Sequence, residues 1–176
     1  MDIEEALLNE HSKTQTMKIV RFVGADKNRF IKLLNVFFKG EYRITQRAAW
    51  PLSYIAIANP NLIRPHLIKL IKKLNEEGNH PAIKRNILRI FQEIEIPEKH
   101  YGILVDICFK FLLDKKQPIA IRAFAITIAA KISEGYPDLK KELLIVLNEM
   151  HKYPQQPAIT ARLKSAFKTL GGMNSY

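Results

Sequence analysis

Arginine recurs in this chain at a nearly constant interval. Arg47, Arg85 and Arg122 are separated by 38 and 37 residues. A guanidinium group presents a planar fork of donors that matches carboxylates and phosphates, so a row of arginines would suit an extended anionic partner. The same donors can instead hold a fold together, by bonding to main-chain carbonyls or to acidic side chains in turns. The interval therefore predicts either an anion-binding row or a structural one.

Proline follows the same interval and indicates which elements carry the arginines. One series of prolines opens apolar stretches at Pro60, Pro97 and Pro137, and a second series does so at Pro81, Pro118 and Pro157. Proline is favoured at the first turn of a helix, where its missing N–H has no partner to lose. Apolar residues in these stretches recur at three- and four-residue steps, and no stretch alternates like a half-buried strand. A fixed period near 38 residues predicts a solenoid of helical repeats.

Reading helix starts from the prolines and helix ends from isolated glycines divides the chain into paired helices. We expect a single repeat domain over residues 1–170, with a frayed tail at 171–176. The expected helices are 3–9, 12–23, 26–39, 43–57, 61–75, 81–95, 98–113, 118–133, 137–151 and 157–170. They pair as about four repeats, 26–57, 61–95, 98–133 and 137–170, preceded by an N-terminal cap at 3–23 that includes a half-repeat.

No set of residues in the sequence has the pattern of a catalytic or metal site. Cys108 lies between Ile107 and Phe109 in an amphipathic stretch, which predicts burial rather than nucleophilic chemistry. No glycine-rich phosphate loop is present. The histidines lie far apart, mostly near predicted turns, and lack metal-binding spacing: His11, His66, His80, His100 and His151. We therefore expect a protein that is not an enzyme, with no metal and no cofactor.

The bulk composition describes a basic protein with enough apolar residues for a core. The 176 residues carry a net charge of +11 and are 47% hydrophobic, with a sequence pI near 9.8. No apolar run approaches the length that spans a bilayer, and the acidic N-terminus lacks the plan of a signal peptide. A single cysteine suits a reducing compartment. These features predict a cytoplasmic protein that attracts anionic partners and not membranes.

One segment shows the repeat most clearly. Residues 113–125 read Leu-Asp-Lys-Lys-Gln-Pro-Ile-Ala-Ile-Arg-Ala-Phe-Ala, an acidic turn followed by a helix that opens with an aliphatic–arginine step and continues with alanines. This pattern resembles a HEAT repeat, and the resemblance extends over residues 26–170. Pro65 matches a proline at which the first helix of such repeats often kinks, and Pro51 should kink the second helix of its own repeat. The resemblance implies an all-α, right-handed α-solenoid of the HEAT or armadillo type.

In a HEAT solenoid the second helices line the concave side, where extended partners bind. The expected second helices carry ten basic residues and only two acidic ones, Glu93 and Glu95. The resemblance therefore implies a non-enzymatic scaffold that binds an acidic protein or peptide on a basic concave face. The candidate binding residues are Arg43, Arg47, Lys84, Arg85, Arg89, Arg122 and Lys164. Tyr42 and Tyr54 flank the first part of this face, and aromatic side chains beside arginines also suit nucleic acids.

The alternative is a nucleic-acid-binding protein similar in shape to the HEAT-like DNA alkylation repair glycosylases, but without their catalysis. Those enzymes use a carboxylate and aromatic residues that face a basic groove. Here the second helices offer only Glu93 and Glu95, at the end of one helix. Trp50, the sole tryptophan, aligns with Leu88 and Ala125 and is expected in the core.

Overall fold

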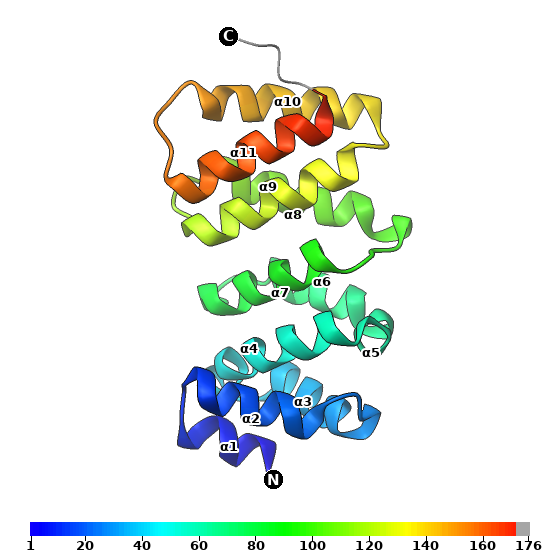
Figure 1. The fold of residues 1–176 in the computed structure, drawn as a ribbon, viewed down its shortest axis with the longest axis vertical. Helices are drawn as coiled ribbons and strands as arrows, with labels where there is room; N and C mark the ends of the chain where they lie inside the picture. The colour runs from blue at the N-terminus through cyan, green and yellow to red at the C-terminus, as the bar shows by residue number, and fades with distance from the viewer. Residues whose placement is uncertain (172–176) are drawn as a thin grey trace. The chain divides into compact units, whose positions relative to one another are not determined.

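The computed structural model describes residues 1–171, which belong to two compact units, Met1–Glu95 (unit 1) and Ile96–Tyr176 (unit 2). Both units consist of helices joined by short turns, as Figure 1 shows. The described residues contain no strand, so the all-α prediction is confirmed. The predicted tail lies, except for Gly171, outside the described residues. The single domain over residues 1–170 stays a prediction.

Unit 1 is a stack of paired helices. Helix α3 packs on α4 and α6 on α7, while α4 lies between α2 and α7 (Figure 1). The elements are α1 (Ile3–Asn9), α2 (Lys13–Val23), α3 (Lys27–Lys39), α4 (Tyr42–Ala58), α5 (Pro60–Ile63), the 3₁₀ turn η1 (Arg64–His66), α6 (Leu67–Asn75) and α7 (Pro81–Glu93).

Unit 2 repeats this design with two helix pairs. Helix α8 packs on α9 and α10 on α11, and α9 and α11 lie side by side (Figure 1). The elements are the 3₁₀ turn η2 (Glu98–His100), α8 (Tyr101–Leu113), α9 (Ile119–Ser133), α10 (Pro137–His151) and α11 (Pro157–Leu170).

The helix boundaries follow from capping chemistry. The side chains of Asp2, Ser12 and Asp26 accept hydrogen bonds from the first-turn amides of α1, α2 and α3. Prolines occupy the first turn of α5, α7, α10 and α11, as the proline series predicts. Gly24 ends α2 with a φ of 51°, in the left-handed half of backbone space that glycine adopts without strain.

One predicted helix, residues 61–75, is interrupted in the structure. The chain forms α5, then η1 at Arg64–His66, and only then α6. Pro65 lies inside η1, and a proline cannot donate the i→i−4 hydrogen bond that a continuous α-helix requires at that position. Helix α4, by contrast, continues through Pro51.

The core of unit 2 contains Cys108, whose side chain is fully buried in α8. Burial without charged neighbours raises the pKa of this thiol far above its usual range. We expect a disulfide reagent such as DTNB to leave Cys108 unmodified in the folded chain and to react with one thiol per chain in urea, because the thiolate is the nucleophile. Rapid stoichiometric modification of the native protein, followed by thionitrobenzoate absorbance, would contradict this burial.

Candidate functional site

Helix α4 gathers basic and aromatic side chains along one stripe. Arg43, Arg47, Trp50 and Tyr54 follow one another at steps of four, three and four residues, which places them on one side of the helix. Helix α7 packs against α4 and brings further basic residues beside this stripe. We name the combined set the α4–α7 basic surface: Arg43, Arg47, Trp50 and Tyr54 of α4, with Lys84, Arg85 and Arg89 of α7.

Arg89 and Tyr54 link the two helices of this surface. The guanidinium carbon of Arg89 lies 4.5 Å from the centroid of the Tyr54 ring, a cation–π distance. Hydrogen bonding from Arg89 is the largest influence on the Tyr54 phenol and lowers its pKa, while partial burial acts in the opposite direction. The Arg89 charge, a hydrogen bond from Trp50 and the charge of Lys13 lower the pKa further. The phenol of Tyr54 thus lies in a positive potential.

His11 lies beside Trp50 of this surface and is exposed to the same positive potential. Its ring meets the Trp50 ring edge-on, with centroids 5.9 Å apart. Burial is the main cause that lowers the pKa of His11, and the charges of Arg47 and Arg85 lower it further. His11 therefore stays neutral at neutral pH and adds no charge of its own to the cluster.

Two of the three regularly spaced arginines bond to main-chain carbonyls. Arg47 Nη1 donates to the carbonyl oxygens of Leu7 and Leu8, at 2.8 and 2.9 Å, near the end of α1. Arg122 Nη2 donates to the Leu112 carbonyl near the end of α8, at 3.4 Å. The last carbonyls of a helix lack intrahelical partners, so these arginines hold helices together. Arg85 is the exposed member of the series.

We expect Arg47→Gln to lower the free energy of unfolding by about 1–3 kcal/mol, because the part-buried carbonyl of Leu7 and the exposed carbonyl of Leu8 lose a charged donor. Amide hydrogen exchange should accelerate first in α1, which Arg47 attaches to α4. Arg43→Gln removes the same charge from an exposed site one turn earlier and serves as the control. Equal effects of the two substitutions would show that charge, rather than the carbonyl contacts, accounts for the loss.

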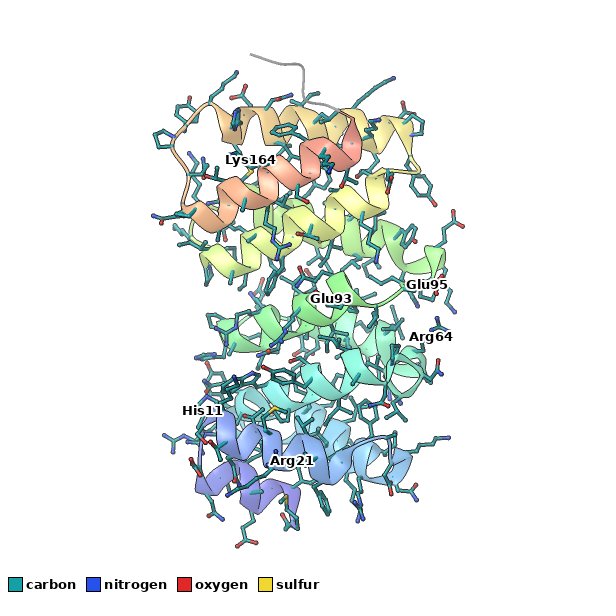
Figure 2. All side chains as sticks on the ribbon, in the orientation of Figure 1. His11, Arg21, Arg64, Glu93, Glu95 and Lys164 are labelled. Atoms are coloured by element: carbon teal, nitrogen blue, oxygen red, sulfur yellow. The ribbon has the colours of Figure 1, made fainter. Side chains whose placement is uncertain are left out.

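The acidic side chains of unit 1 that form ion pairs do so with residues outside the α4–α7 basic surface. Glu93 is the last residue of α7, and Glu95 pairs with Arg64 at 3.0 Å. Figure 2 shows Arg64 and Glu95 at the opposite end of the unit 1 helices from His11. The other ion pairs among the described residues join neighbours in sequence, such as Arg29 with Asp26 and Lys73 with Glu76. No ion pair within residues 1–171 involves Arg43, Arg85 or Arg89.

Five of the seven candidate residues lie on α4 and α7, two helices of unit 1 that pack against each other. The other two belong to unit 2, where Arg122 is half-buried in α9 and Lys164 is exposed on α11 (Figure 2). Tyr42, the other aromatic residue expected beside this face, is 60% exposed and its ring packs edge-on to His80. His80 itself accepts a hydrogen bond from the Ala82 amide at the start of α7.

The prediction that Trp50 lies in the core is wrong. It was expected in the core, but its side chain is half-buried, contacts His11 and hydrogen-bonds Tyr54. Its register with Arg43 and Arg47 on one stripe of α4 was the signal for this position. The alignment of the repeats predicts burial instead, because the equivalent positions hold Leu88 and Ala125, which are buried. His11 was missed as a neighbour because it precedes α2, far from Trp50 in the sequence.

The part of the chain that the structure describes has no group of three His, Cys, Asp or Glu side chains placed to hold a metal ion. Within the same residues no helix has both the length and the apolar character needed to cross a bilayer. Chemically, the α4–α7 basic surface offers guanidinium donors to anionic groups.

Comparison with models of protein families shows which family this chain resembles. The model of the HEAT repeat domain matches residues 3–170, nearly the entire chain. No curated protein and no solved structure matches it. This match is consistent with the paired helices and with the aliphatic–arginine step at Ile121–Arg122. The chain belongs to the HEAT repeat family.

Proposed function

We propose that this protein is a non-enzymatic binding scaffold that takes an acidic protein or peptide on the α4–α7 basic surface. A HEAT repeat domain implies a helical repeat of the kind used for binding. The observation that carries the proposal is the set of arginines on α4 and α7 that form no ion pair with a carboxylate of the described residues, Arg43, Arg85 and Arg89.

Like charges close together repel one another in the folded state, so arginines that form no ion pair gain from an anionic partner. Arg85 and Arg89 are four residues apart on α7 and therefore lie on the same side of the helix. Carboxylates of an acidic segment could be bound there by both side chains together. The Arg47 and Arg85 charges extend this potential toward His11.

The alternative partner is a nucleic acid, because Trp50 and Tyr54 lie among the arginines. Base stacking needs an open aromatic face. Here Arg89 already covers the Tyr54 ring, and the Trp50 ring is engaged by His11. These contacts favour an acidic protein over a single-stranded nucleic acid.

Fluorescence anisotropy at low salt and at about 0.15 M salt tests the proposal. The probes are labelled peptides of Asp and Glu interleaved with Gly and Ser, and single- and double-stranded DNA and RNA of matched charge. We expect the acidic peptide to bind at both salt concentrations. Nucleic-acid affinity should fall tenfold or more between them, because phosphate contacts release counterions.

Tight nucleic-acid binding at physiological salt, lost on charge reversal of Arg85 and Arg89, would replace the acidic peptide with the alternative partner. Binding of every polyanion at low salt alone, unaffected by these substitutions, would reject both partners for this surface.

A further inference from the structure

Unit 2 contains a hollow that the basic surface of unit 1 does not explain. Its volume is about 710 Å³, within the range of ligand-binding clefts. It lies between the end of α8, the turn before α9, the second half of α10 and the loop after α10. The side chains that matter for its chemistry are Leu113, Lys115, Arg122, Ile145, Met150 and Tyr153.

Three bulky apolar side chains that line the hollow are exposed to solvent. Ile145 is 67% exposed, Leu113 65% and Tyr153 64%, the three largest values among the exposed bulky apolar residues of the described chain. They lie together around one hollow rather than singly. Clustered exposed apolar side chains mark interaction sites, whereas scattered ones do not.

Helix α10 shows why these side chains remain uncovered. Residues 143–147 form an unbroken apolar run, Leu-Leu-Ile-Val-Leu. Successive residues of a helix are turned by about 100°, so such a run cannot face a single core. Leu143 and Leu147 are the buried residues of α10, and Ile145, two positions from each, faces away from the core. The core of unit 2 therefore does not need the apolar group at Ile145.

The charge of the hollow comes from Arg122 and Lys115. Arg122 Nη2 makes one long bond to the Leu112 carbonyl, and the buried Nε has no hydrogen-bond partner among the described residues. Lys115 is exposed at the rim. The lining carboxylate, Glu149, is paired with Lys152. Asp114, next to the hollow, accepts hydrogen bonds from the Lys116 amide and the Gln117 side chain.

The charges of Arg122 and the exposed Lys115 beside an apolar wall suit a carboxylate that arrives together with an apolar group. We propose that this hollow binds a peptide segment of a partner protein in which bulky apolar side chains stand next to aspartate or glutamate. The apolar side chains contact Ile145, Leu113 and Tyr153, and the carboxylate faces Arg122 and Lys115. This site is separate from the α4–α7 basic surface and does not depend on it.

Selection from a random peptide library against the full-length chain tests the proposal without a known ligand. We expect the enriched peptides to combine bulky apolar residues with Asp or Glu. Labelled synthetic copies should then lose about tenfold or more of their affinity for Ile145→Asp, because the substitution places a carboxylate in the apolar wall. Ile103→Asp is the matched control, since Ile103 is 43% exposed on α8 and does not line the hollow. The affinity of the Ile103→Asp variant for the same peptides should stay within about twofold of the wild-type value.

A second variant tests the charge. Lys115→Glu should weaken the same peptides and spare copies in which Asn and Gln replace Asp and Glu, because only the acidic peptides face repulsion. Lys115 is exposed, so this variant keeps the test open even if substitution of the half-buried Arg122 impairs folding.

Three results would overturn the proposal. The first is a selection that enriches no peptides, or peptides without carboxylates. The second is enriched peptides that lose affinity with charge reversal of Arg85 and Arg89 but not with Ile145→Asp, which would place them on the α4–α7 basic surface. The third is self-association of the chain, measured by sedimentation, that Ile145→Asp abolishes, which would assign the hollow to a second copy of this protein. Failure of the acidic peptide without apolar residues to bind unit 1 would reject the proposed function alone.

Discussion

Replacing both Arg85 and Arg89 with glutamate is expected to lower the affinity for an acidic peptide by about a hundredfold or more. Each reversal exchanges an attraction for a repulsion, and even about 1.4 kcal/mol per site multiplies to that factor. Both residues lie on α7, and Arg89 also covers the Tyr54 ring. Anisotropy titrations of the wild type and the double variant at physiological salt measure the effect.

The matched control reverses Lys69 and Lys72, two exposed residues of α6 that change the net charge of unit 1 by the same amount. We expect this control to reduce affinity only slightly, through the general field of the protein. Thermal unfolding should show that the Arg85 and Arg89 variant remains folded. Equal losses in the two double variants would mean that net charge alone attracts the peptide. Unfolding of the Arg85 and Arg89 variant would identify these arginines as structural.

The second large effect is on stability. Phe91→Ala is expected to lower the free energy of unfolding of unit 1 by about 3–5 kcal/mol, because the phenyl ring is fully buried in α7 and its loss leaves a cavity. Such a loss is a large part of the stability of a typical domain. Urea unfolding followed by the fluorescence of Trp50, the sole tryptophan, reports on unit 1.

Ile68→Ala is the control for this measurement, because Ile68 is 38% exposed on α6 and leaves a smaller cavity. A loss below about 1 kcal/mol is expected there. Similar midpoints for the two variants would show that the packing around Phe91 relaxes or that unit 1 does not unfold in one step.

The sequence predicts the helices well because their ends depend on local chemistry. Pro81, Pro137 and Pro157 start helices where expected, and Gly24 ends one. The break at η1 was harder to place, since Pro65 also fits a kinked continuous helix. The HEAT resemblance is confirmed by the family match over residues 3–170. The right-handed sense of the solenoid stays a prediction.

The roles of individual arginines could not be read from their spacing. Arg47, Arg85 and Arg122 occupy equivalent places in the repeat, yet only Arg47 and Arg122 bond to carbonyls near the ends of other helices. That difference depends on where α1 and α8 end in space, which is a tertiary property. The hollow of unit 2 was missed for the same reason, because it needs the end of α8 and the second half of α10 to lie together.

The Arg47 contacts have a consequence for how this protein tolerates change in its surroundings. A main-chain carbonyl has no proton to gain and no net charge, so the attachment of α1 does not titrate in the physiological range and is only weakly sensitive to ions. Arg43 and Arg85, which are exposed, interact with the solvent, and dissolved salt screens their charges. Substitutions at the exposed arginines can therefore change the charge of this surface while the helices that carry them stay joined, so that evolution can alter the surface without disturbing the architecture.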